Sequence, residues 1–174
     1  FGHLIFTYIK HDHSLINTLK GALKTAKLFG QYRDEETAEH LYRMSHYSRI
    51  IAEQMAESCN LSDAFIEQVF QFSPLHDIGK IAIPDRILLK PGQLTDPEYQ
   101  EMKTHVVRGV EMVDMLIQQF GLNGVHNISV LRNIVYYHHE RFDGSGYPVG
   151  LKGSQIPVEA RIVAVADVFD ALTS

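Results

Sequence analysis

The sequence places metal-ligating side chains next to each other at two points, His76-Asp77 and His138-His139. His138 follows Ile134 by four residues in an apolar segment, so both side chains project to the same side of a helix. A carboxylate buried in a core costs several kcal/mol unless it is paired or binds a metal. The two pairs therefore indicate a buried metal site more strongly than separate hydrogen-bonded core residues.

Further candidate ligands occur at helical spacing. Glu36 and His40 are four residues apart, and Asp167 follows Val163 by four residues in another apolar segment. The inward polar set consists of Glu36, His40, His76, Asp77, His105, His138, His139 and Asp167. This set is larger than one ion can bind, so we expect about two or three divalent ions that share bridging carboxylates.

Imidazole and carboxylate ligands suit several transition metals. We expect Fe or Mn, with Ni or Zn as alternatives. Two such ions about 3.5–4 Å apart activate water and hold the attacking and leaving oxygens of a phosphoester. Asp77 is the expected bridge because each of its oxygens can bind one ion. Lys80, three residues later, can place a fixed cation on a phosphate oxygen. The pattern predicts metal-assisted phosphoester hydrolysis, with Asp77 and Lys80 as the catalytic residues.

Two more charged residues share faces with these ligands. Arg43 lies three residues after His40 and could contact a phosphate of the substrate. Asp170 lies three residues after Asp167 and also projects inward. We expect Asp170 to contact the substrate or a metal-bound water, with a hydrogen bond from its helix to a loop as the alternative.

Helical periodicity must position all of these residues, since no segment shows sustained strand alternation. Thr95 and Glu98 form a capping box that opens one helix, and Ser62 and Asp63 cap another. Helices are expected over 15–29 and 35–58, after 62, after 95, from about 105, over 127–139 and from about 158. We predict an all-α bundle of about seven or eight helices with a glycine-rich loop.

Composition excludes several classes of function. The chain of 174 residues has 16 Lys and Arg against 21 Asp and Glu, a net charge of −5, which argues against DNA or RNA as a partner. The single cysteine, Cys59, excludes an internal disulfide framework and a thiolate zinc finger. No apolar run reaches the ~18 residues needed to cross a bilayer, and Leu4 to Ile9 is too short for a signal peptide.

The run His76-Asp77-Ile78-Gly79-Lys80, together with HHERFDGSGYP from His138 to Pro148, closely resembles the HD-GYP family of the HD metal-dependent phosphohydrolases. The resemblance extends from about Glu36 to Ser174. It implies an HD-domain helical bundle and a cytoplasmic bacterial phosphodiesterase that hydrolyses cyclic di-GMP to pGpG or onward to GMP. 3′,3′-cyclic GMP–AMP is the alternative substrate, and a catalytically silent cyclic-dinucleotide receptor is the alternative of another class.

The resemblance also implies roles for individual residues. The family's ligands map onto His76, Asp77, His105, His138, His139 and Asp167. Some members add a Glu and a His that match Glu36 and His40, which gives room for a third ion. The loop Gly146-Tyr147-Pro148 is linked in the family to substrate access and to docking of GGDEF diguanylate cyclases.

The same resemblance divides the chain into two parts. Residues 31–174 are expected to be the catalytic domain, and residues 1–30 a linker or accessory helix through which two copies could pair. Family members usually continue with a basic Arg-Pro-Tyr-type segment after the last helix, so we expect the C-terminus to be truncated.

Overall fold

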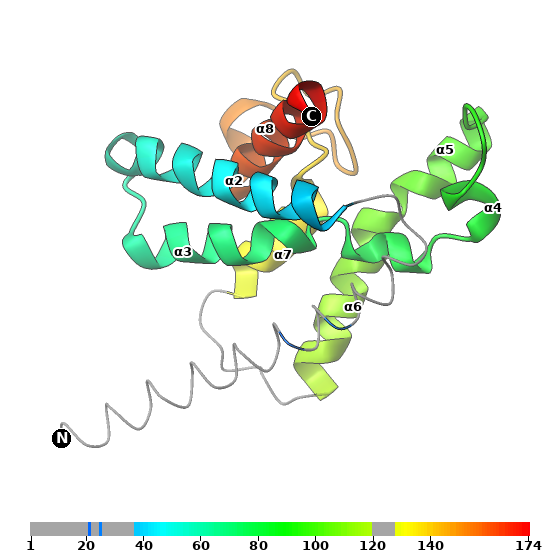
Figure 1. Cartoon of the computed structure of the whole chain (residues 1–174), viewed down its shortest axis with the longest axis horizontal. Coiled ribbons are helices and arrows are strands. Elements are labelled where there is room, and N and C mark those ends of the chain that lie inside the picture. Colours follow the sequence, from blue (N-terminus) through cyan, green and yellow to red (C-terminus); the bar gives the residue numbers. More distant parts are fainter. Residues whose placement is uncertain (1–20, 22–24, 26–36, 120–127) are drawn as a thin grey trace.

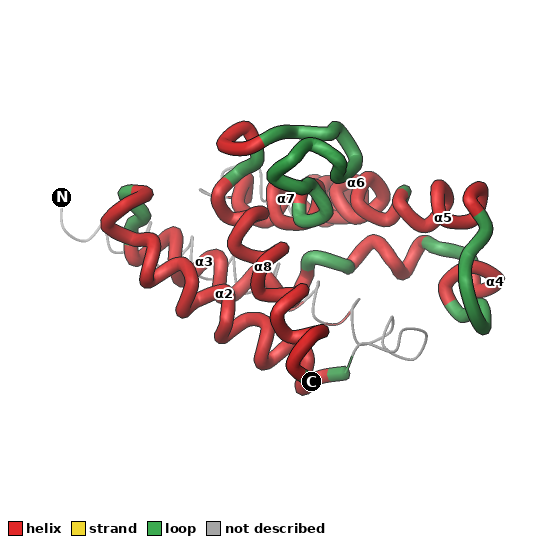
Figure 2. The backbone as a smooth tube through the Cα atoms, turned by 90° about the horizontal axis from the view of Figure 1, so that it is seen from above, coloured by secondary structure: helices red, strands yellow, loops and turns green. Residues whose placement is uncertain are grey.

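The computed structural model describes residues 37–119 and 128–174, together with Gly21 and Thr25. The described residues form helices, turns and loops, and none of them lies in a strand (Figure 2). The elements are α2 (Ala38–Cys59), α3 (Asp63–Phe72), η1 (Ser73–Leu75), η2 (Ile78–Ala82), α4 (Asp85–Leu88), α5 (Asp96–Lys103), α6 (His105–Gln119), α7 (Ile128–Tyr137), η3 (Gly153–Gln155) and α8 (Val158–Thr173). The predicted all-α class is confirmed. Glu36 and, apart from Gly21 and Thr25, the expected 1–30 element lie outside the described residues.

Helix starts follow the capping residues that the sequence indicated. Ser62 Oγ accepts a hydrogen bond from Phe65 N at 3.2 Å, and the Glu98 carboxylate accepts one from Thr95 N at 2.8 Å. These bonds satisfy backbone donors that a helix start leaves without an intrahelical partner. Helix α2 begins later than expected, after the N-cap residue Thr37, whose Oγ1 accepts from His40 N at 3.1 Å. His40 is therefore fixed in the first turn of α2.

The helix expected over 127–139 is shorter in the structure. Helix α7 ends at Tyr137, and His138 and His139 lie in the turn that follows it. The backbone N–H of His138 still bonds to Ile134 O at 3.2 Å, so the inward direction of its side chain is kept. The turn gives His139 a direction that helical spacing alone would not give.

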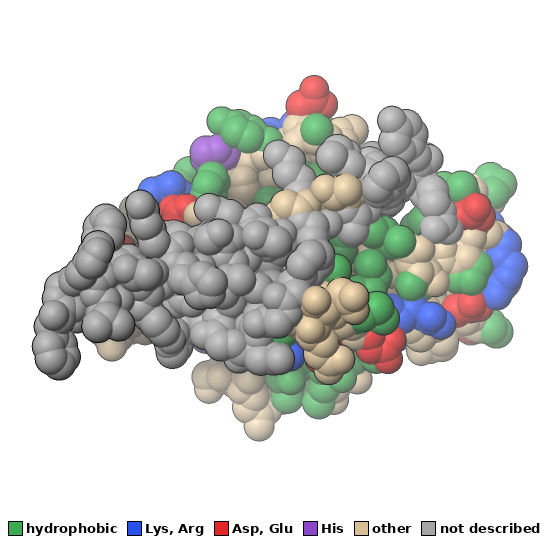
Figure 3. Space-filling view, turned by 90° about the horizontal axis from the view of Figure 1, so that it is seen from below, with side chains coloured by type: hydrophobic (Ala, Val, Ile, Leu, Met, Phe, Trp, Pro, Cys, Tyr) green, Lys and Arg blue, Asp and Glu red, His purple; other side chains and the backbone are tan. Residues whose placement is uncertain are grey.

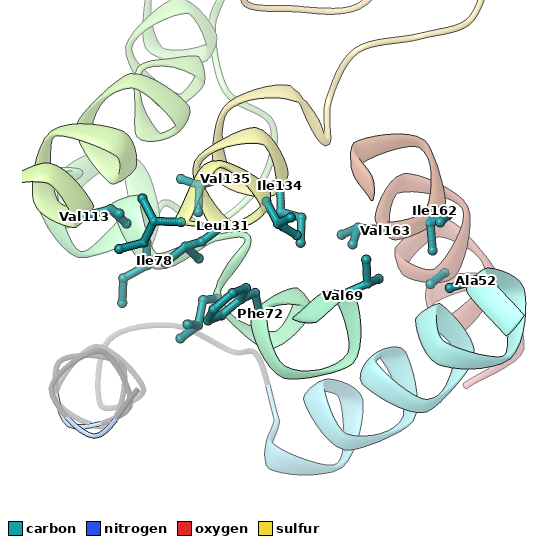
Figure 4. Close-up of a cluster of buried hydrophobic side chains, with 14 of the residues drawn as sticks. Ala52, Val69, Phe72, Ile78, Val113, Leu131, Ile134, Val135, Ile162 and Val163 are labelled. Atoms are coloured by element: carbon teal, nitrogen blue, oxygen red, sulfur yellow. The ribbon is translucent and has the colours of Figure 1, made fainter. Parts of the chain in front are cut away.

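Helix α7 lies at the centre of the apolar core. Figure 4 shows side chains from α3, α6, α7 and α8 pointing towards one another. The apolar core includes Val69, Phe72, Val113, Leu131, Ile134, Val135, Ile162 and Val163. Each such side chain contributes about 1.5–3 kcal/mol when it is fully buried. Helix α2 packs against both α3 and α8 (Figure 1), so this core holds in place the helix ends that carry the polar residues.

Two glycines allow η2 to contact α6 directly. A Cβ on Gly79 would lie 1.9 Å from His105 O and 2.5 Å from Gly109 N. A Cβ on Gly109 would lie 2.6 Å from Val135 Cγ1. A Cβ on Gly109 would also lie 3.3 Å from Gly79 N, so the backbones of η2 and α6 approach closely at these two glycines, and Asp77 lies beside His105.

The described surface carries mixed charge. On the face drawn in Figure 3, Lys and Arg side chains lie close to Asp and Glu side chains. Between α4 and α5, for example, Arg86 donates two hydrogen bonds to the Glu101 carboxylate at 2.9 and 3.0 Å. Among the described helices, none is both long enough and apolar enough to span a membrane.

Replacing Gly79 by alanine tests the close contact between η2 and α6. We expect Gly79→Ala to lower the free energy of unfolding by about 1–3 kcal/mol, because the new methyl group overlaps backbone atoms that cannot rotate away. Urea denaturation followed by circular dichroism measures the change. Gly21→Ala is the control, since a Cβ at that helical glycine would meet no atom within 4 Å. Equal stability of the two variants would contradict the proposed contact.

Candidate metal centre

Four of the predicted ligands converge in one group, which we call group A: Asp77, His105, His138 and His139. One ligand atom from each lies within 4.8 Å of those of the others. Asp77 Oδ1 is 3.0 Å from His105 Nε2 and 3.3 Å from His138 Nε2. The residues come from the start of η2, the start of α6 and the end of α7, so the group forms only when these three elements pack together.

A second group, group B, consists of His40, His76 and Asp167. Asp167 Oδ1 lies 3.5 Å from His40 Nε2 and 3.9 Å from His76 Nε2. His76 Nε2 is also 3.3 Å from Asp77 Oδ2. The two oxygens of Asp77 therefore face different groups, which is the arrangement expected of a bridging carboxylate.

Backbone carbonyls orient three of the imidazoles. In each of them Nδ1 bonds to the carbonyl oxygen of a residue three or four positions earlier, and Nε2 faces the centre. The pairs are His76 with Ser73 at 2.9 Å, His105 with Met102 at 2.8 Å and His138 with Ile134 at 2.9 Å. A neutral imidazole that donates from Nδ1 presents a lone pair at Nε2, which is the state that binds a metal.

The donor set fits a metal ion. Asp77 Oδ1, His105 Nε2 and His138 Nε2 are buried and have no hydrogen-bond partner. Because the two imidazoles donate from Nδ1, their Nε2 lone pairs face the oxygen of Asp77 and repel it. A cation bound by the two nitrogens and this oxygen would remove the repulsion. A buried polar atom left unsatisfied costs about 1–3 kcal/mol.

The pKa shifts favour the ligand forms of these side chains. Burial opposes ionisation of Asp77, but the Lys80 ammonium, whose Nζ is 2.8 Å from Oδ2, helps to hold the pKa of this carboxyl well below its usual value. Burial lowers the pKa of His138, and burial together with His138 lowers the pKa of His139 to about 2. An ionised carboxylate beside neutral imidazoles is the protonation state in which these groups bind metals.

Tyr147 covers group A from the loop between α7 and α8. Its ring stacks on His139 at a centroid distance of 4.6 Å and an interplanar angle of 25°, and its backbone N–H bonds to His139 O at 3.2 Å. Lys103 Nζ lies 5.2 Å from the centroid of the same ring. Burial raises the pKa of Tyr147 above its usual value, which keeps the phenol protonated. A Cβ on Gly146 would lie 2.3 Å from Arg141 N, so the loop can pack against the backbone of Arg141 only with glycine at this position.

Glu140 holds this loop in place, a role that we did not predict from the sequence. Its buried carboxylate accepts hydrogen bonds from the backbone N–H groups of Val149 at 2.8 Å, Gly150 at 3.1 Å and Leu151 at 2.9 Å. These three N–H groups are not bonded within a helix or a strand ladder, so the ionised carboxylate of Glu140 accepts their hydrogen bonds instead. An acidic residue directly before a glycine-rich loop is the signal that could have indicated this role.

A cleft of about 630 Å³ opens over both groups. Its lining includes His40, Asp77, His105, His139 and Asp167 from the two groups, together with Arg43, Lys80, Tyr147 and Asp170. Arg43 and Asp170, both expected to bind substrate, are paired with each other: Arg43 Nε lies 2.7 Å from Asp170 Oδ1. This bond lowers the pKa of Asp170 to about 2. Contact of either residue with a substrate stays a prediction, as does the ligand role of Glu36 outside the described residues.

Residues 35–174 match the family model described as HD domain. The chain belongs to the HD domain family. It is 50% identical over 144 residues, 83% of this chain and 35% of the relative, to the "Cyclic di-GMP phosphodiesterase response regulator RpfG" of Xanthomonas campestris pv. campestris. It is 44% identical over 155 residues, 87% of this chain and 38% of the relative, to a "Cyclic di-GMP phosphodiesterase" of Thermotoga maritima.

A Vibrio cholerae relative carries the name "3'3'-cGAMP-specific phosphodiesterase 2" and is 41% identical over 140 residues, 80% of this HD-domain chain and 25% of the relative. The names and identities of these relatives confirm the resemblance to the HD-GYP branch of the HD superfamily. The chain spans between a quarter and two fifths of the length of these curated relatives.

Metal removal tests the fit of the donor set. At a free metal concentration about 100 times Kd, binding to the folded state adds about 2.7 kcal/mol of stability, which should raise Tm by roughly 5–10 °C for a chain of this size. Differential scanning fluorimetry with Mn²⁺ and then with a chelator measures the shift. Asp77→Ala should abolish it, and a full shift in this variant would contradict a shared Asp77 ligand.

Glu140→Gln tests the anchoring of the loop. The amide retains one acceptor oxygen but loses the charge and turns an NH₂ group towards backbone donors, so we expect a loss of about 1.5–3 kcal/mol. Hydrogen exchange should become faster at the amides of residues 149–151 while protection of α7 and α8 is kept. Glu53→Gln, at the surface of α2, is the matched control. Unchanged exchange in the loop would refute the anchor.

Proposed function

We propose that this domain hydrolyses one phosphodiester bond of cyclic di-GMP to give linear pGpG, or hydrolyses both bonds to give GMP. The observation that carries the proposal is the position of Asp77, whose two oxygens face group A and group B at the same cleft. The names of the relatives that match most of this chain support the same substrate class. As the chain spans only part of those relatives, the activity is proposed for this domain on its own residues.

Group A and group B would each hold a divalent ion, with Asp77 between them. When bound, the ions would supply Lewis-acid activation of water and of the phosphodiester oxygens. Nitrogen and oxygen donors favour Fe or Mn, and Ni or Zn are the alternatives. The resemblance implies a third ion held by Glu36 and His40; because His40 Nδ1 bonds to Asp170, that ion would compete with group B for His40 Nε2. Neutral imidazoles add no negative charge, so two divalent ions beside the carboxylates of Asp77 and Asp167 would leave a net positive charge that attracts an anionic phosphodiester.

The chain's own residues would bind and orient the substrate. Lys80 Nζ lies 2.8 Å from Asp77 Oδ2 and lines the cleft, so it can contact a phosphate oxygen close to the bridging carboxylate. Tyr147 limits access from the side of His139, because its ring covers that imidazole. The backbone carbonyl bonds at Nδ1 keep the imidazoles of His105 and His138 from rotating when the substrate binds.

3′,3′-cyclic GMP–AMP is the second candidate substrate, favoured by the name of the Vibrio cholerae relative. A catalytically silent receptor for cyclic dinucleotides is the candidate from another class. The remaining proposals are that the Gly146-Tyr147-Pro148 loop docks a GGDEF diguanylate cyclase, that residues 1–30 pair two copies, and that the protein works in the bacterial cytoplasm. They rest on the resemblance.

Turnover by the purified protein tests the proposal. The protein is loaded with Fe(II) or Mn²⁺, given cyclic di-GMP or 3′,3′-cyclic GMP–AMP, and the linear products are followed by chromatography. We expect Lys80→Ala to lower kcat by about 10²–10³-fold, the usual loss when one charge-stabilising donor is removed. Metal content of this variant is measured in parallel, since Lys80 also contacts Asp77. Tight binding of both nucleotides without any product would favour the receptor instead.

A further inference from the structure

We propose that Asp170 and Arg43 are positioning residues that orient the imidazole of His40 towards group B, and that the affinity of group B for metal therefore depends on this pair while that of group A does not. The inference rests on the proposed function only in assigning divalent ions to the two groups.

His40 is oriented differently from the other imidazoles. His76, His105 and His138 bond through Nδ1 to backbone carbonyls of their own chain segments. His40 Nδ1 instead lies 2.7 Å from Asp170 Oδ2, a side chain on α8. His40 stands in the first turn of α2, three residues after the N-cap Thr37, and its acceptor comes from the neighbouring helix α8.

The bond to Asp170 sets the direction of the opposite nitrogen. With the Nδ1 proton donated to a carboxylate, His40 presents its Nε2 lone pair, which lies 3.5 Å from Asp167 Oδ1 in group B. A carboxylate at this position also makes the imidazole a stronger ligand. Asp167 and Asp170 are three residues apart on α8, so one helix face supplies both a group B ligand and the residue that orients its partner.

Arg43 holds Asp170 in this position. Its Nε and Nη2 donate to Asp170 Oδ1 at 2.7 Å and Oδ2 at 2.9 Å. The Asp170 side chain is only 2% exposed, so without this two-point pairing a buried charge would be left uncompensated. Arg43 lies one turn after His40 on α2, and the pair therefore connects α2 to α8 at the point where group B forms.

The two groups consequently depend on different interactions. In group A, His105 and His138 take their orientation from backbone bonds that form with the local structure. In group B, His40 takes it from a side-chain pair between two helices. Loss of the Asp170 charge should weaken metal binding in group B and leave group A nearly unchanged.

Metal titration of the purified chain tests this difference. Mn²⁺ binding is measured by isothermal titration calorimetry against a competing chelator in the wild type, Asp170→Asn, Arg43→Gln and the double variant. We expect two affinity classes in the wild type. Asp170→Asn should weaken one class about 10–100-fold, the usual loss for the carboxylate partner of a metal-binding histidine, and keep the other within about twofold. Arg43→Gln should weaken the same class, and the two effects should not add.

Controls separate this role from a general effect on folding. Arg49→Gln removes an α2 arginine from a surface pair with Glu53 at 2.9 Å, and both metal affinities should stay at the wild-type values. Asp170→Asn should keep the α-helical circular dichroism of the metal-free protein. Equal weakening of both classes in Asp170→Asn would overturn the inference, as would intact metal binding combined with a raised KM, which would assign Arg43 and Asp170 to the substrate. Absence of metal binding in the wild type would refute the metal centre itself.

Discussion

The structure depends on a buried carboxylate placed between two sets of imidazoles. Asp77 is ionised in a position where burial opposes charge, with Oδ1 facing His105 and His138 and Oδ2 facing His76 and Lys80. A lone carboxylate there would cost several kcal/mol, so the arrangement is stable only with compensating cations. Lys80 supplies one such charge, and the inward lone pairs provide ligands for divalent ions. Both the stability of the fold and the proposed chemistry therefore require cations beside Asp77.

The surrounding elements serve to bring their ends to Asp77. Gly79 and Gly109 remove the side chains that would keep η2 away from α6, and the apolar core fixes α7 and α8 around them. In the loop after α7, three backbone N–H groups donate hydrogen bonds to the single carboxylate of Glu140. Three of the seven candidate ligands lie in helices and four lie in turns beside helix ends, while a loop held at one anchor covers the site.

Much of this could be predicted from the sequence. The single set of candidate ligands expected from adjacency and helical spacing includes every member of group A and group B, because spacing determines which side chains share a helix face. Helix ends were less accurate: α7 ends before His138, and α2 begins after Thr37. The mutual pairing of Arg43 with Asp170 was not predicted, since it joins residues 127 positions apart and no local pattern encodes that contact. The role of Glu140 was missed because backbone donors of a loop leave no periodic signal.

The sequence by itself determined the helical class, the residue types of the candidate ligands and the HD-GYP resemblance, because periodicity and motifs are local properties of the chain. Only the tertiary structure decided how the ligands divide into two groups and which oxygen of Asp77 faces each group. It also decided that the carboxylate of Asp170 contacts His40. These facts depend on distances of a few ångströms between α2, η2, α6, α7 and α8, and such distances are set by the packing of the whole core rather than by any one segment.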